Sequence, residues 1–178
     1  MSNLVKVVVL ATLVAFAGFF GGCSNKPRYG KYNVQVSMDP TLASSAAVPS
    51  IEVDIIGVSP ERAAVWDAQS LNNYFAAANM ERQTADKFTM RFGAGATAPQ
   101  TLQISDAMWA KWAGSGAHHL YILASLPGVS TDAPGPADPR RLILPLDTRQ
   151  WDKGQTIQVE VQRNRLQLRT APKPLPAN

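Results

Sequence analysis

The stretch "TIQVEVQRNRLQL", Thr156 to Leu168, decides the fold class of this 178-residue chain. Apolar residues occupy every second position from Ile157 to Val161, and two further apolar residues, Leu166 and Leu168, follow the polar segment around Asn164. A period of two is the side-chain alternation of a strand with one buried face. Asn tolerates the positive φ of a tight hairpin turn. The stretch therefore predicts two antiparallel strands joined at Asn164.

Further strands follow from the same pattern upstream. Alternation predicts strands at Tyr32–Met38, Ile51–Val58 and Lys87–Phe92, and two more continuously apolar runs, His118–Leu126 and Arg140–Leu146, predict strands that are buried more deeply. Pro145 has no N–H to donate, which places the last of these at a sheet edge or ends it early. We predict an all-β protein, a small antiparallel β-sandwich of about seven strands.

Helical signals are short and local. The order Ser-Pro-Glu at 59–61 places an N-cap residue, a first-turn proline and a carboxylate before "PERAAVWD", which predicts a helix that buries Val65 or Trp66. A second helix is expected over "DAMWAKW" at 106–112. The region 70–86 between them is ambiguous, a short helix at 71–75 followed by loop. We expect one or two such helices as insertions between the strands.

The N-terminus has the layout of an export signal. Lys6 and the terminal amine supply positive charge, and Val7–Phe20 carries none. This apolar run is shorter than the roughly 20 residues of a membrane-spanning helix. We predict that residues 1–22 are a cleaved signal peptide.

Phe20, Gly21, Gly22 and Cys23 resemble the lipobox of bacterial lipoproteins, in which an apolar and two small residues precede an acylated cysteine. Cys23 is the only cysteine of the chain, so it cannot form an internal disulfide, and acylation accounts for a lone thiol in an oxidising compartment. The resemblance implies lipidation at Cys23, and Ser24 implies sorting to the periplasmic face of the outer membrane. The alternatives are a secreted protein with a spare thiol and an uncleaved anchor.

The remaining chain divides into three parts. We predict a lipidated tether at 23–31, one β-sandwich domain at 32–170 and a proline-rich tail at 171–178. No block of Lys and Arg indicates a nucleic-acid partner. The tether's cations, Lys26, Arg28 and Lys31, either contact anionic headgroups or belong to a solvated linker.

Catalytic patterns are absent from the sequence. Adjacent His118 and His119 point to opposite faces of a strand and cannot chelate one ion together. Glu52 and Asp54 share a strand face, which is either a carboxylate pair or a solvated outer face. We predict no catalytic residue, no metal site and no cofactor. The helical pair Trp109 and Trp112 either packs on the sheet or, if exposed, stacks a sugar.

The order of these segments is similar to that of TssJ, the outer-membrane lipoprotein of type VI secretion systems. The similarity covers the lipobox, the first strand, the loop with Asp39 and Pro40, "PSIEVDIIGV", "HHLYILASLPG", "RRLILPLD" and the closing hairpin. It implies a transthyretin-like β-sandwich that is not an enzyme. It also implies that the protein tethers the inner-membrane protein TssM at the outer membrane.

The same resemblance implies that the loop Asp39–Ser50 contacts the partner. Its candidate contact residues are Asp39, Pro40, Thr41, Leu42 and Val48. A binding loop on a rigid scaffold typically carries such apolar residues among small polar ones. The alternatives are a mobile loop without a role and, for the whole protein, an envelope lipoprotein that binds a glycan or small ligand.

Overall fold

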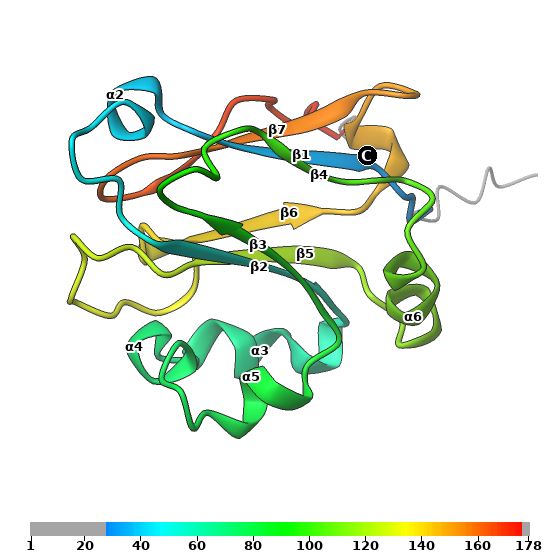
Figure 1. The fold of residues 1–178 in the computed structure, drawn as a ribbon. Helices are drawn as coiled ribbons and strands as arrows, with labels where there is room; N and C mark the ends of the chain where they lie inside the picture. Colours follow the sequence, from blue (N-terminus) through cyan, green and yellow to red (C-terminus); the bar gives the residue numbers. More distant parts are fainter. Residues whose placement is uncertain (1–27, 176–178) are drawn as a thin grey trace, which may run out of the picture.

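Two four-stranded sheets packed face to face form the body of the protein in a computed structural model, which describes residues 28–175 (Figure 1). The first sheet has the strand order β4-β1-β7-β8 and the second has the order β3-β2-β5-β6. The strands are β1 (Asn33–Met38), β2 (Ile51–Val58), β3 (Lys87–Phe92), β4 (Gln100–Leu102), β5 (His119–Ala124), β6 (Arg141–Pro145), β7 (Thr156–Val161) and β8 (Leu166–Leu168). The predicted β-sandwich is confirmed.

All seven predicted strands are present, and β6 is an edge strand that ends at Pro145, as expected. Strand β4 was not predicted, because three residues are too few to show an alternation. The prediction of a wholly antiparallel sandwich was wrong at one place, since β1 and β7 run parallel with Val36 beside Val159. Alternation reports one buried face and is the same for parallel and antiparallel neighbours.

The β7–β8 hairpin forms with a different turn from the one predicted. Val161 lies opposite Leu166, and the Gln162 N–H donates to the Arg165 carbonyl at 2.9 Å. Among residues 28–175, glycines alone have positive φ, so Asn164 does not adopt the left-handed conformation that we expected. The two strands therefore pair through a turn in which no residue needs a positive φ.

The main core lies between the two sheets. It is built from alternating side chains of the strands, including Val34 and Val36 of β1, Val53 and Ile55 of β2, and Val159 of β7. Burying an aliphatic side chain of this size contributes about 1.5–3 kcal/mol relative to leaving it exposed. The core therefore accounts for the strict alternation of apolar and polar residues along β1 and β7.

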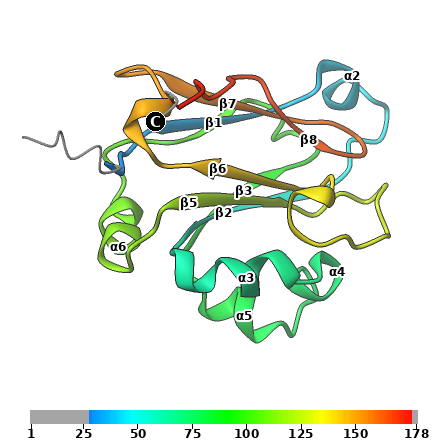
Figure 2. The same ribbon diagram turned by 180° about the vertical axis from the view of Figure 1, so that it is seen from behind.

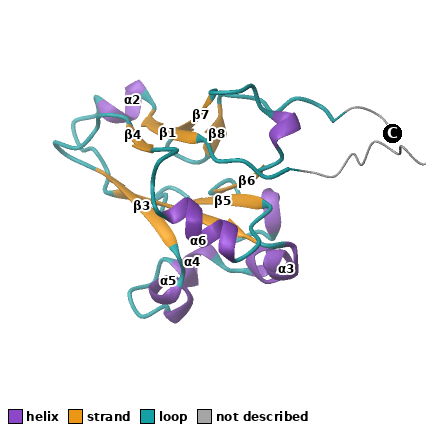
Figure 3. Ribbon diagram, turned by 90° about the vertical axis from the view of Figure 1, so that its right-hand side faces the viewer, coloured by secondary structure: helices purple, strands orange, loops and turns teal. Residues whose placement is uncertain are grey.

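A second core lies on the opposite face of the second sheet, beneath a layer of helices (Figures 1 and 3). The described α-helices are α2 (Pro40–Ala43), α3 (Pro60–Ala68), α4 (Leu71–Tyr74), α5 (Met80–Thr84) and α6 (Met108–Gly114), so residues 28–175 hold more helices than the one or two expected. Two short 3-10 helices are Gly135–Ala137 and Thr148–Gln150. Helices α3, α4 and α5 cover this face, and Trp66, Leu71 and Tyr74 pack on Ile56 and Tyr121.

Of the two candidates in α3, Trp66 is the buried residue and Val65 is exposed. Both faces of the second sheet are thus covered, and the deep burial predicted for β5 is confirmed. In residues 28–175 no helix combines the length and the apolar character required to cross a bilayer.

We expect Gly57→Ala to destabilise the protein, because a Cβ at this position of β2 would lie 2.3 Å from Cγ of the buried Trp112. Overpacking of this kind costs about 1–3 kcal/mol, measurable by urea unfolding.

Gly114→Ala is the matched control on the helix that carries Trp112. A Cβ at Gly114 meets no atom within 4 Å, so this variant should retain or slightly raise the free energy of unfolding. Equal stability of the two variants would contradict the tight contact between β2 and α6.

Candidate functional site

Three loops meet at one end of the sandwich, which we call the loop end (Figure 2). They are the segment 39–50 with α2, the segment 127–139, and the tip of the β7–β8 hairpin at 162–165. Together they enclose a groove of about 230 Å³, the loop-end groove, lined by Leu42, Ala47, Pro49, Ile51, Pro127, Gly128 and Arg163. Most of these side chains are apolar, and Arg163 is the cation among them.

Asp39 organises the first loop. Its backbone N–H donates to the Val161 carbonyl at 2.9 Å, which fixes the loop to the end of β7. Its carboxylate caps α2 by accepting from the backbone N–H groups of Thr41 (2.9 Å) and Leu42 (3.3 Å), and it also accepts from the Thr41 hydroxyl. These hydrogen bonds, that of the Thr41 hydroxyl first, lower the pKa of Asp39. Asp-Pro is an N-cap signal, and the sequence prediction of a plain loop missed α2.

The candidate contact residues of this loop do not all face solvent. Leu42 is buried in the main core and lines the groove, and Val48 packs half-buried against the same core. Pro40, Thr41 and Ala47 are exposed. The apolar residues thus hold the loop in place, while small residues form its outer surface.

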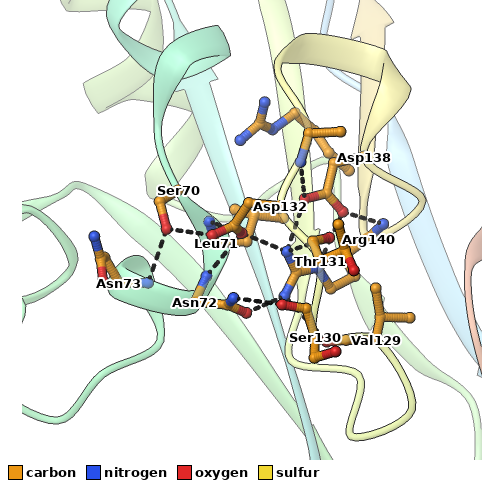
Figure 4. Close-up of polar contacts among 12 residues, drawn as sticks. Ser70, Leu71, Asn72, Asn73, Val129, Ser130, Thr131, Asp132, Asp138 and Arg140 are labelled. Atoms are coloured by element: carbon orange, nitrogen blue, oxygen red, sulfur yellow. Dashed lines mark hydrogen bonds and ion pairs between the residues drawn. The ribbon is translucent and has the colours of Figure 1, made fainter.

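Arg140 fixes the second loop through a network of polar contacts that is buried at Asp138 and exposed at Asp132 (Figure 4). Its Nη2 donates to Asp132 at 2.5 Å and to Asp138 at 2.8 Å, its Nε donates to Asp138 at 3.0 Å, and its Nη1 donates to Asn72 at 2.7 Å. The side chain of Asp138 is fully buried and that of Arg140 nearly so. Asp132 and Asp138 therefore share one guanidinium.

Asp132 also caps α4. Its Oδ1 accepts from the backbone N–H groups of Leu71 (2.9 Å) and Asn72 (3.1 Å), and its Oδ2 accepts from the Ser70 hydroxyl at 2.6 Å. Burial disfavours the charged forms of Asp132 and Asp138, but the hydrogen bonds outweigh it and hold the pKa of each carboxyl below its usual value. The long loop is thereby attached to the helical layer.

Asp54 lies inside the molecule, so the solvated outer face, one of the two alternatives for this strand face, does not hold for it. The helical layer covers it, and its carboxylate accepts from Arg82 Nε (2.8 Å), Tyr74 Oη (3.0 Å) and Thr89 Oγ1 (2.6 Å). Glu52 accepts from Arg82 Nη2 at 2.5 Å. The hydrogen bond from Arg82 lowers the pKa of Glu52. Arg82 thus bridges the two carboxylates, and Glu52 also accepts from Arg91 Nε at 2.8 Å.

The histidines lie at the other end of the sandwich. Tyr29 stacks on His118 with 3.8 Å between ring centroids. His119 is half-buried, and burial lowers its pKa. Within residues 28–175 no group of three His, Cys, Asp or Glu side chains is placed to hold a metal ion.

Trp109 and Trp112 are buried, with relative exposures of 2% and 1%. Their rings are nearly perpendicular, at 86°, and their indole N–H groups donate to the carbonyls of Gln103 (3.0 Å) and Asp86 (2.8 Å). A sugar-stacking platform needs exposed ring faces, so this pair packs on the sheet instead. The predicted lipidation site, Cys23, lies outside the described residues.

We expect Arg140→Met to lower the free energy of unfolding by about 3–5 kcal/mol, because Asp138 would be left as a buried, unpaired charge. In the wild type the lowered carboxyl pKa values stabilise the fold above about pH 4, the pKa of an unfolded aspartate, and this contribution is lost on acidification. In the variant, burial without the guanidinium raises the pKa of Asp138, so protonation at lower pH relieves part of the cost of the buried charge. Relative to the wild type, the substitution should therefore lower the free energy of unfolding less at pH 5 than at pH 7. Urea unfolding at both pH values measures this.

Lys111→Met is the control, since it removes an exposed ion pair with Asp86 that is worth about 0–1 kcal/mol. Similar losses in the two variants, or a loss in Arg140→Met that does not change with pH, would refute the role of Arg140.

No family model and no curated protein matches the sequence. Solved structures do match, among them a chain of a structure described as "Type VI membrane complex", with a TM-score of 0.51 and 14% identity over 79% of this chain and 98% of that chain. Lip from Serratia marcescens, described as a membrane bound component of the Type VI Secretion System, gives 0.47 and 14% over 79% and 98%. The T6SS lipoprotein TssJ1 from Pseudomonas aeruginosa gives 0.46 and 12% over 84% and 100%.

At this sequence identity the similarity concerns the fold alone. It rests on the first of these structures, whose TM-score is above 0.5. The resemblance that we found in the order of sequence segments is confirmed at that level. The chain is a β-sandwich of the kind found in a type VI membrane complex.

Proposed function

We propose that this protein is a lipid-anchored structural component of a type VI secretion membrane complex, and that it holds a partner resembling TssM at the periplasmic face of the outer membrane. The observation that carries the proposal is the fold shared with a chain of a type VI membrane complex. The lipobox-like residues Phe20 to Cys23 add the means of attachment. Two or three acyl chains on Cys23 would anchor it stably, because each buried methylene contributes about 0.8 kcal/mol.

The path of the chain supports a bridging role. The described chain enters the sandwich at residues 28–31, directly before β1, and the loop-end groove follows directly after β1. A strand rises about 3.3 Å per residue, so the six residues of β1 place the groove about 20 Å from this entry. An anchor at Cys23 would leave the loop end facing away from the bilayer, where a periplasmic partner has access.

The loop end is suited to binding a protein segment. The cap formed by Asp39 and the network around Arg140 fix the two loops before a partner arrives, which reduces the entropy lost on binding. We assign the contact to the loop segment that contains Asp39, Pro40, Thr41, Leu42 and Val48, with the exposed Pro40 and Thr41 nearest the partner. Leu42 lines the groove and Val48 supports the loop beneath it.

Arg163 adds a charge preference to this surface. It is exposed and forms no ion pair within the described part of the chain. Its guanidinium suits a carboxylate of the bound segment. The polar clusters beneath the surface, around Asp54 and Arg140, are fully used in structural contacts. We therefore propose a role without catalysis.

We expect Ala47→Glu to weaken binding of the periplasmic part of a TssM-like protein encoded in the same genome. A glutamate in the rim of this groove occupies space that the segment needs, and its carboxylate is either desolvated on binding or pairs with Arg163 in competition with the segment. The dissociation constant should therefore rise about tenfold or more, equivalent to about 1.4 kcal/mol. Biolayer interferometry measures this directly. Ala78→Glu, an exposed alanine of the α4–α5 connection, is the control. Unchanged affinity of Ala47→Glu would reject the loop-end groove as the contact.

We expect Cys23→Ser to move the protein from the membrane fraction to the soluble fraction, because the serine hydroxyl does not accept the thioether-linked lipid. Mass spectrometry of the wild-type N-terminal peptide should show the acylated cysteine, and Asn25→Ala should behave like the wild type. A Cys23→Ser protein that still sediments with washed membranes would overturn the anchor.

A further inference from the structure

A second groove lies at the opposite end of the sandwich, where the described chain begins. We call this the entry end. The groove measures about 330 Å³ and is lined by Gly30, Lys31, Tyr32, Asn33, Ile104, Thr148, Trp151, Asp152, Lys153, Gly154 and Gln155. Neither the β1–β2 loop nor the loop-end groove contributes to it, so the proposed partner contact leaves it free.

The segment that enters here is held firmly to the sandwich. The Gly30 N–H donates to the Leu146 carbonyl at 2.8 Å, the Thr148 N–H donates to the Arg28 carbonyl at 2.7 Å, and Tyr29 forms a β-bridge with Asp147. The cations that flank Tyr29 and Gly30 therefore have a defined position beside the groove.

The rim of the groove is positively charged. Arg28, Lys31 and Lys153 are exposed and form no ion pair among residues 28–175. The nearby carboxylates are already neutralised, Asp147 by Arg149 and Asp152 by Lys173. The entry end thus presents an excess of cations to any approaching surface.

Apolar side chains stand beside these cations. Ile104 is 47% exposed and Tyr29 is 42% exposed, whereas Trp151 forms part of the groove floor. The Ile104 N–H donates to Asn33 Oδ1 at 2.7 Å, which fixes the position of this isoleucine. Exposed Tyr and aliphatic side chains among Lys and Arg are typical of surfaces that lie in the headgroup region of a bilayer.

We propose that the entry end binds anionic phospholipid headgroups, with Lys31 and Lys153 contacting phosphate and Ile104 inserting at the membrane surface. The orientation rests on the proposed anchor, since the five peptide units from Cys23 to Arg28 span at most about 18 Å. The charge complementarity does not depend on the anchor. The surface would fix the tilt of the sandwich and point the loop end into the periplasm.

The test uses the chain from residue 23 to 178 with Cys23→Ser, which has no lipid and retains both cores of residues 28–175. It should bind vesicles that contain phosphatidylglycerol more strongly than vesicles of phosphatidylcholine alone, and added salt should weaken the binding. Lys31→Gln with Lys153→Gln should weaken it about 25-fold, at about fivefold for each cation near the surface.

The control removes two exposed cations that lie away from the entry end, Arg91 of β3 and Arg165 of the β7–β8 turn, by Arg91→Gln with Arg165→Gln. Glu52, the ion-pair partner of Arg91, keeps its second contact with Arg82. It should retain nearly all vesicle binding. Equal losses in the two double variants would show attraction by net charge only and overturn the proposal, as would equal binding to the two kinds of vesicle.

A second measurement reports insertion. In the chain without Cys23, a polarity-sensitive fluorophore on Ile104→Cys should shift to the blue with phosphatidylglycerol vesicles. The same label on Val65→Cys, an exposed apolar position of α3, should not shift. If the label at position 104 does not shift, the entry end is rejected as a membrane-binding surface. Because this chain carries no acyl group, the result does not depend on whether Cys23 is acylated in cells.

Discussion

The position of β1 in the first sheet is the constraint from which the rest of the arrangement follows. β1 pairs with β4 on one side and, in parallel, with β7 on the other, so its backbone hydrogen bonds hold it in the centre of that sheet. Its alternate side chains lie in the main core. Because a central strand cannot shift its register without turning that apolar set to solvent, the segments before and after β1 have defined places at opposite ends of the molecule.

Both faces of the second sheet are covered by other parts of the chain. One face packs on the first sheet, and the other packs on α3, α4 and α5. Such a layer brings polar backbone and charged groups into the interior, and these need partners. Arg82 and Arg140 supply them to Asp54 and Asp138. These two charged clusters therefore hold loops and helices to the sandwich.

The two ends of the sandwich differ in chemistry. The loop end has an apolar groove with Arg163 at its rim, built from segments far apart in the chain. The entry end has cations around Ile104 and Tyr29 that form no ion pair with any residue of the described range 28–175. An apolar groove between fixed loops suits a protein segment, whereas dispersed cations with exposed apolar side chains suit a lipid surface. The proposed functions of the two ends are thus compatible with one protein that links a membrane to a partner.

The sequence by itself determined seven of the strands, the closing hairpin, the edge position of Pro145 and the start of α3 at Pro60, because alternation and turn chemistry are local properties. It also determined the lipobox-like residues around Cys23. Only the tertiary structure decided that β1 and β7 are parallel, that β4 completes the first sheet, and that Asp54 is buried. The assembly of the loop-end groove from three distant segments was decided there as well. The physical reason is that the neighbours covering a strand face or a loop come from distant parts of the chain, and no local pattern specifies them.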